Sequence, residues 1–338
     1  MENNFTAVQS AALSLIQSDL RFLYTVIKNI NPKKSNYIPS LLPYMGVIVD
    51  GTEDWIKSFN NSNKNKLNAP MFNQSEQLYY EKMRDSIKMW QKGYDEIYEL
   101  LKQAYEESDR YFSSVCKPIA KQLKLYDIYG VDIINEVICG NTILCYIYNP
   151  FFSFNNDNGE YIKVMSEIGG KYIATFDAAY EYQIDESLEF DTLDYGGFVK
   201  SPVGNEFSDK FVLFSILSQI NFLLYGVEQW IKEEIPTKMR FHYLLYYSLM
   251  EVVPQINQKM GTTFKIDSRW NSKKFRNAMA HYKLGIALKE EELIVDDKLF
   301  GLTQKLFEEP YINVKNAIVD ELLSLSKQIE RYLQVQSN

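Results

Sequence analysis

The helical spacing of apolar side chains is the feature that most constrains the fold of this 338-residue chain. Between residues 75 and 109, apolar and aromatic side chains recur every three or four positions, at Tyr79, Met83, Ile87, Trp90, Tyr94, Ile97 and Leu101. A stripe with this period covers one face of a helix and packs against a core or a second helix. Because similar patterns fill most of the chain, the sequence predicts an all-α protein.

Four helices are predicted in the C-terminal part. They span residues 206–234, 238–259, 268–284 and 311–335. Pro236 separates the first two, and Pro254 is expected to kink or end the second, because proline removes a backbone donor and clashes with the preceding turn. The stretch 286–300 alternates enough to form either a short hairpin or a broken helix, and both alternatives stay open.

The N-terminal half is also predicted to be mostly helical. The expected helical segments are residues 5–30, 36–58, 75–109 and 112–148. A polar loop is expected at residues 59–70. Residues 150–204, rich in Asn, Gly, Asp and aromatic side chains, are expected to be irregular with short strands.

A domain boundary is predicted near residue 200, where Gly196-Gly197, Pro202 and Gly204 cluster. We therefore expect a mostly helical N-terminal domain of residues 1–200 and a helical-bundle domain of residues 205–338. The N-terminal domain shows no phosphate-binding glycine loop and no nucleophile elbow. A regulatory or sensing role is expected for it.

Charge is unevenly distributed along the chain. The net charge of −8 matches nucleic acid poorly as a whole. Residues 259–283, however, carry seven Lys or Arg against one acid, Asp267, whereas residues 172–199 carry seven acids and no Lys or Arg. The basic stretch favours a phosphate site, with a solvated basic face as the alternative. The acidic stretch is expected to be a surface loop, and the alternative is that it mimics nucleic acid and covers the basic cleft.

Cysteine usage and hydropathy predict a cytoplasmic protein. Cys116, Cys139 and Cys145 show neither metal-ligand spacing nor a disulfide framework, so they are expected to be reduced thiols. The N-terminus lacks the basic segment of a signal peptide. The most apolar run, residues 211–227, is interrupted by polar side chains and predicts a core helix, so no membrane contact is expected.

One short segment, residues 274–282, combines side chains that perform chemistry. Within a helix of residues 268–284, capped by Asp267 or Ser268 and stopped at Gly285, the basic and polar side chains share one face. Arg276, Asn277 and His281 lie on this face. The opposite face is apolar and contains Phe275, Ala278, Met279 and Tyr282.

These groups suit a phosphate diester. Arginine can hold two phosphate oxygens, histidine exchanges a proton near neutral pH, and asparagine can orient either partner. RNA cleavage without a metal needs little more than a base, an acid and a cation. We assign Arg276, Asn277 and His281 as catalytic candidates, with no cofactor and no metal ligand. Four further cations are expected to bind RNA, namely Arg269, Lys273, Lys274 and Lys283. The alternative is a structural histidine beside a solvated Arg-Asn pair.

The order Arg276-Asn277, three residues, then His281 resembles the signature of the HEPN superfamily. That signature is an Arg, a polar residue and a His, with four to six residues between the Arg and the His. The resemblance covers residues 205–338. It implies an endoribonuclease of the kind found in toxin–antitoxin pairs, abortive infection and other antiviral defence. Lys283 stands where one subset of the family has a modified Tyr, which argues against that subset.

The resemblance and the chemistry together imply an assembly. In-line cleavage benefits from two proton transfers, but the motif supplies one imidazole, and His242 lies in an apolar stretch. We therefore expect a homodimer, or a larger even assembly, with two motif helices facing one cleft. An activator or antitoxin partner is a further expectation. The alternative function is a non-catalytic HEPN-like binding or regulatory module.

Three further side chains each have two possible roles near the motif. Glu228 and Glu251, on the first two predicted helices of residues 205–338, can orient Arg276 through an ion pair or serve the core. Trp270 can stack on a base or pack internally, and packing is the default for an aromatic side chain.

Overall fold

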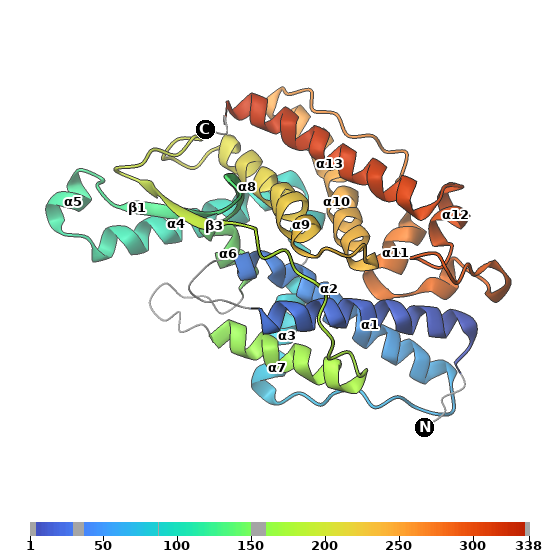
Figure 1. The fold of residues 1–338 in the computed structure, drawn as a ribbon. Helices are drawn as coiled ribbons and strands as arrows, with labels where there is room; N and C mark the ends of the chain where they lie inside the picture. Colours follow the sequence, from blue (N-terminus) through green and yellow to red (C-terminus); the bar gives the residue numbers. More distant parts are fainter. Residues whose placement is uncertain (1–4, 30–36, 87, 150–159, 335–338) are drawn as a thin grey trace.

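The computed structural model describes residues 5–29, 37–86, 88–149 and 160–334, and most of them are helical. Helices from the two ends of the chain lie against each other in a helical body (Figure 1). One group comes from the N-terminal half and comprises α1 (Ala7–Lys28), α2 (Tyr37–Ser62), α3 (Gln74–Ser86) and α7 (Glu160–Thr175). The other group comes from the C-terminal part and comprises α8 (Asp209–Asn221), α10 (Pro236–Met260), α11 (Lys273–His281), α12 (Leu302–Phe307) and α13 (Tyr311–Leu333).

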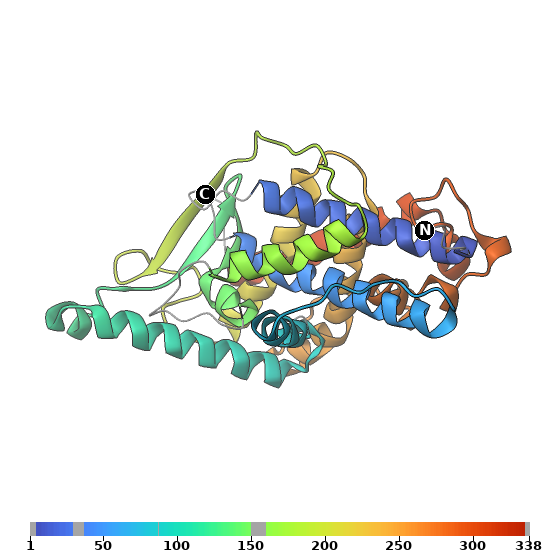
Figure 2. The ribbon, with the colours of Figure 1, turned by 90° about the horizontal axis from the view of Figure 1, so that it is seen from below.

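A small antiparallel sheet corrects the all-α prediction to a mostly helical fold with three strands. The strands are β1 (Asp127–Ile134), β2 (Val137–Asn141) and β3 (Phe190–Gly196), in the order β2-β1-β3. The sheet lies at one end of the molecule (Figure 2). Helix α4 (Tyr94–Val115) packs beside β1, and α8 packs beside β2.

The predicted helix over residues 112–148 is therefore wrong between residues 127 and 141. Asn135 and Glu136 both adopt positive φ, at 46° and 68°, and form a two-residue turn that pairs Ile134 with Val137. Such a turn matches the twist of a hairpin and cannot continue a helix. Within residues 112–148, the helical parts are the end of α4, α5 (Pro118–Gln122) and α6 (Thr142–Tyr148).

The predicted helix over residues 75–109 is interrupted once. Helix α3 ends at Ser86, a single 3-10 turn η1 (Met89–Gln91) follows, and α4 begins after Gly93. The predicted core stripe is confirmed for the described side chains, because Tyr79, Met83, Trp90, Tyr94, Ile97 and Leu101 are all buried. Ile87 lies outside the described residues. The break matters because it places Trp90 and Gln91 beside the motif helix.

The apolar stretch 206–234 is helical from Asp209 to Trp230, inside the predicted bounds, and its winding changes along the way. Helix α8 passes into a π-helical segment η2 (Phe222–Val227) and then α9 (Glu228–Trp230). Among the described residues, Asp209–Trp230 is the one helical stretch long and apolar enough to span a membrane. Of its most apolar window, 89% is buried inside the protein, as is also found for a core helix.

Three other predictions have clear outcomes in the C-terminal part. Pro254 does not end its helix, since α10 continues to Met260 and stops at Gly261, whose φ is 65°. Helix α13 confirms the predicted helix of residues 311–335 as far as Leu333, and residue 335 lies outside the described residues. Between α11 and α12 the chain forms two single 3-10 turns, η3 (Leu284–Ile286) and η4 (Glu290–Glu292). This matches the broken-helix alternative, and the described residues there contain no hairpin.

Buried side chains from both halves of the chain form one contiguous apolar core. The predicted boundary near residue 200 lies in the connection between β3 and α8. Helices α1 and α2 from the first half pack on α10 and α11 from the second. The division into domains of residues 1–200 and 205–338 stays a prediction.

Candidate functional site

The motif helix α11 is shorter than predicted. It begins after Ser272, whose hydroxyl accepts the backbone N–H of Phe275 at 3.2 Å, so neither Asp267 nor Ser268 is the N-cap. It ends at Tyr282, which adopts the left-handed conformation with φ 51°, and not at Gly285. Tyr243 of α10 fixes the start, because its hydroxyl accepts the backbone N–H of Ser272 at 3.1 Å.

The two predicted faces of the helix are present. Phe275, Ala278 and Met279 are buried and face the core, as is Tyr282 just beyond the helix. The polar side chains are half-buried on the other side, namely Arg276, Asn277 and His281. The side chain of His281 is 24% exposed. It is therefore not the fully buried core histidine that the structural alternative requires.

A buried arginine holds the C-terminal end of α11. Arg240 of α10 donates hydrogen bonds to the backbone carbonyls of Met279 and Ala280, the latter at 3.1 Å. These carbonyls belong to the last turn, which lacks partners within the helix. Arg240 also pairs with Asp19 of α1, and the Tyr282 hydroxyl donates to the same carboxylate at 2.6 Å. Arg240 was not predicted from the sequence, although a charged residue in an apolar helical run was an available signal.

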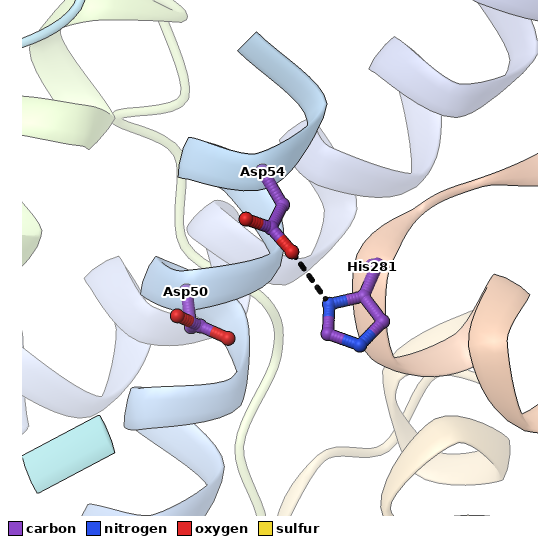
Figure 3. Close-up of side chains that lie close together, drawn as sticks. All are labelled: Asp50, Asp54 and His281. Carbon is purple, nitrogen blue, oxygen red and sulfur yellow. Dashed lines mark ion pairs between the residues drawn. The ribbon is translucent and has the colours of Figure 1, made fainter. Parts of the chain in front are cut away.

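Helix α2 packs on α11 and supplies a carboxylate to the motif. The Asp54 Oδ2 atom lies 3.0 Å from the His281 Nδ1 atom (Figure 3). The two atoms are at hydrogen-bond distance, but Nδ1 makes no aligned hydrogen bond. The other ring nitrogen, Nε2, points away from Asp54. Asp54 was not predicted from the sequence, because no local pattern links it to residue 281.

Burial lowers the pKa of His281 below its ordinary value of 6.5. Asp54 opposes this effect by stabilising the charged imidazolium, whereas the cations Lys283 and Arg276 lower the pKa further. Because the net direction is downward, the imidazole is mainly neutral at pH 7. A neutral imidazole can accept a proton.

Arg276 is oriented by neutral partners. Its guanidinium donates to the Gln91 side-chain oxygen at 2.9 Å and to the Asn277 side-chain oxygen at 3.1 Å. Of the two roles considered for Glu228, the structure shows the structural one, because this carboxylate binds Lys315 of α13 at 2.5 Å. Because both partners are neutral amides, they do not compensate the positive charge of Arg276. This favours an anion as the ligand.

A cavity of about 300 Å³ opens beside the motif. Arg276 and His281 line it. It is otherwise formed by Pro43, Tyr44, Val47, Asp50, Lys88, Trp90, Gln91, Tyr148, Gln219, Leu244, Leu245, Ser248 and Ala280. The volume is at the lower end of small-molecule sites, which span about 300–1,000 Å³.

A chain of buried hydrogen bonds crosses the wall of this cavity. The Trp90 indole donates to the Tyr148 hydroxyl at 2.7 Å, and that hydroxyl donates to the Gln219 oxygen at 2.9 Å. The Gln219 nitrogen donates to the Tyr44 hydroxyl at 3.0 Å. These four side chains come from four separate elements. The sequence predicted a core position for Trp90 and did not identify the other three as cavity residues.

The predicted RNA-binding cations divide into two sets. Lys283 is close enough to His281 to lower its pKa. Lys273 and Lys274 are exposed in the first turn of α11, about 12 Å along the axis from His281. Arg269 is exposed and lies with its guanidinium 4.4 Å from the centre of the Trp270 ring.

Two more side chains near the motif, one aromatic and one basic, have clear positions. Trp270 is buried against Phe307 and packs internally, as expected by default for an aromatic side chain. Lys88, which was not a candidate from the sequence, lines the cavity.

Asp50, Asp54 and His281 form a group that can hold a metal ion. Among the described residues they are the one set of three His, Cys, Asp or Glu side chains whose ligand atoms all lie within 4.8 Å of one another. No metal ligand was predicted from the sequence.

Comparisons with protein-family models, with curated proteins and with solved structures find no match to this chain. The resemblance of Arg276, Asn277 and His281 to the HEPN signature therefore stays a prediction. A fold alone does not fix a function, so the function is argued from the site.

Proposed function

We propose that this protein is a metal-independent endoribonuclease that acts in phage defence or as a toxin. One observation carries the proposal: the imidazole of His281 and the guanidinium of Arg276 line the same cavity, and the Asp54 carboxylate lies 3.0 Å from the imidazole. A proton acceptor, a fixed cation and a carboxylate that stabilises the protonated acceptor are the groups that transphosphorylation needs.

The proposed reaction begins at the 2′-hydroxyl. His281 takes its proton at Nε2 while the 2′-oxygen attacks phosphorus and the bond to the 5′-oxygen breaks. Arg276 stabilises the negative charge that develops on the phosphorane oxygens. Asp54 stabilises the imidazolium, as its effect on the His281 pKa implies. Asn277 positions the guanidinium through its hydrogen bond.

A second proton transfer is needed at the leaving 5′-oxygen. His281 of a second copy of the chain supplies this acid in the proposal, which gives a composite site in a dimer. The buried hydroxyl of Tyr282 is engaged with Asp19 and Arg240, so it is a poor source of this proton.

The cavity suits an unpaired base next to the scissile phosphate. Tyr44, Trp90 and Tyr148 line it with aromatic surface, and single-stranded RNA is commonly held by splayed bases on such surface. The exposed cations Arg269, Lys273 and Lys274 would then contact phosphates farther along the strand. Lys283 would contribute positive charge close to the reacting phosphate.

A second candidate function is a non-catalytic nucleotide-binding or regulatory module. The observation that favours it is the pair of hydrogen bonds that already hold Arg276 in place. In such a module Arg276 and His281 stabilise the fold or bind ligand without turnover. Thermal unfolding separates the two functions: loss of stability in Arg276→Ala and His281→Ala favours a structural role.

The direct test is cleavage of several RNAs by purified protein in EDTA. His281→Ala and Arg276→Ala are expected to lose about 100-fold or more in rate while folding normally, and Asn277→Ala is expected to lose less. Arg110→Ala is the matched control, because this exposed arginine of α4 lies outside the cavity and is not among the predicted RNA-binding cations. A His281→Ala protein as active as the wild type would rule out the assignment.

A further inference from the structure

Asp50, Asp54 and His281 lie close together (Figure 3). The proposed reaction gives roles to Asp54 and His281 but none to Asp50. Asp50 and Asp54 are four residues apart on α2, so both carboxylates lie on the side of that helix that faces His281. One ligand atom from each lies within 4.8 Å of the other two. Two atoms bound to one zinc ion lie at most about 4.4 Å apart, since each bond is about 2.0–2.2 Å long. The separations in the structure, at most 4.8 Å, exceed this limit by at most about 0.4 Å.

The contact between Asp54 and His281 has the spacing of two ligands of a single ion. Their Oδ2 and Nδ1 atoms are 3.0 Å apart, yet Nδ1 is buried and makes no hydrogen bond. Buried side-chain nitrogens in folded proteins nearly always have a hydrogen-bond partner, and a bound ion is one arrangement that satisfies a nitrogen without such a partner. A tetrahedral zinc ion separates neighbouring ligand atoms by about 3.3 Å.

Neighbouring residues orient these ligands through hydrogen bonds and packing, as is usual around metal sites in proteins. Tyr80 donates a hydrogen bond to Asp50 Oδ1 at 3.1 Å. This hydrogen bond orients the carboxylate. Arg240 fixes the end of α11, and α2 packs directly on α11. The two helices therefore keep the carboxylates and the imidazole at a constant separation.

We propose that Asp50, Asp54 and His281 bind a divalent transition-metal ion, and that Zn²⁺ is the best match. Zn²⁺ binds both imidazole nitrogen and carboxylate oxygen, and three protein ligands leave one position of a tetrahedral ion open. Metal bound at Nδ1 requires the ring proton to stay on Nε2. The imidazole then cannot accept a proton from a 2′-hydroxyl, so the occupied site blocks the nuclease. This last step rests on the proposed function.

Binding is tested on the full-length chain by calorimetric titration with Zn²⁺ after chelator treatment. Cys116→Ser serves as the background, because Cys116 is the half-buried thiol and can compete for the metal. One Zn²⁺ per chain is expected. Asp50→Asn and Asp54→Asn should each weaken binding by at least about 10-fold.

Glu53→Gln is the matched control for these variants. It removes the same charge from the same helix, but Glu53 pairs with Lys57 and stands outside the cluster. Zn²⁺ should raise the melting temperature of the parent and of Glu53→Gln, and not that of Asp50→Asn. If Asp54→Asn fails to fold, Asp50→Asn still decides the question. Equal affinity in the parent, Asp50→Asn and Glu53→Gln would overturn the site.

RNA cleavage separates the two proposals. Zn²⁺ should inhibit the parent relative to its rate in EDTA, and inhibit Asp50→Asn much less relative to its own rate in EDTA. Zn²⁺ binding without any RNA cleavage would contradict the nuclease and leave the metal site standing. Cleavage in EDTA without Zn²⁺ binding would contradict the metal site alone. Faster cleavage with Zn²⁺ would overturn the inhibitory role.

Discussion

Gly51 of α2 lies directly against the backbone carbonyl of Ala280 in α11: a Cβ atom at residue 51 would stand 2.5 Å from that oxygen. The same atom would lie 3.0 Å from both Arg240 Nη2 and Tyr282 Cε2. The missing side chain therefore permits the close approach of the two helices. This approach sets the distance between Asp54, one turn farther along α2, and the end of the motif helix.

Gly51→Ala is expected to push α2 away from α11. Overpacking of this kind costs about 1–3 kcal/mol, which exceeds the gain in helix propensity of about 1 kcal/mol. The free energy of unfolding in urea should fall, and RNA cleavage should fall with it. Gly170→Ala in α7 is the control, because a Cβ there meets no atom within 4 Å. A Gly51→Ala protein as stable as Gly170→Ala would contradict the packing argument.

The second prediction concerns the ion pair between Asp19 and Arg240, which are both buried. Asp19→Ala leaves the guanidinium without its counter-charge, and such a loss costs about 3–5 kcal/mol. The unfolding midpoint should drop sharply. Asp95→Ala removes a surface partner of Lys259 and should change the midpoint little. Similar midpoints for the two variants would show that the buried pair does not hold α1 against α10.

The third prediction concerns the products of cleavage. Because the proposed nucleophile is the 2′-oxygen, the upstream fragment should end in a 2′,3′-cyclic phosphate. DNA lacks this hydroxyl, so it should bind through charge and resist cutting. Mass spectrometry of the fragments identifies the ends. Plain 3′-hydroxyl ends, or cleaved DNA, would require a different mechanism.

The fourth prediction concerns assembly. If a second copy supplies the acid, specific activity should fall on dilution as the sedimentation coefficient changes to that of the monomer. Sedimentation and cleavage should be measured over one dilution series. A fully active monomer would defeat the composite site. Lys88, which lines the cavity of the same chain, would then be the acid to test by Lys88→Ala.

The fifth prediction concerns His242, which is fully buried in α10 and donates from Nδ1 to the Lys238 carbonyl at 2.7 Å. Burial lowers its pKa below the ordinary 6.5, although Glu228 and Glu234 oppose the effect and Lys315 adds to it. Between the two pKa values, His242 therefore binds a proton in the unfolded chain but not in the folded protein. Stability is complete above pH 6.5 and declines below it, by at most about 1.4 kcal/mol per pH unit.

Urea unfolding between pH 5 and 8 measures this dependence. In His242→Asn the side-chain amide can donate to the same carbonyl but does not titrate, so the difference between the two curves isolates the histidine. Parallel curves for wild type and His242→Asn would contradict the prediction.

The helical segments were largely predictable because their information is local. The stripe from Tyr79 to Leu101 and the helix that became α13 repeat a 3.6-residue period that needs no knowledge of the rest of the chain. The two faces of α11 followed from the same period. The hairpin at Asn135 was missed because its Asn135-Glu136 turn lacks the glycine that usually marks a two-residue hairpin.

The ends of α11 were misjudged for a tertiary reason. Ser272 became the cap because Tyr243 of another helix binds its backbone N–H, and Tyr282 took the left-handed conformation in a buried network with Arg240 and Asp19. Capping residues compete locally, and contacts outside the helix decide among them.

By itself, the sequence determined that the chain is mostly helical and that Arg276, Asn277 and His281 share one face of a helix. Only the tertiary structure decided that Asp50 and Asp54 meet His281 and that Trp90 and Gln91 close one side of a cavity. Periodicity encodes which face of a helix is buried, but not which distant helix covers the other face. That pairing depends on the fit of whole surfaces, such as the close approach at Gly51, and no short pattern records it.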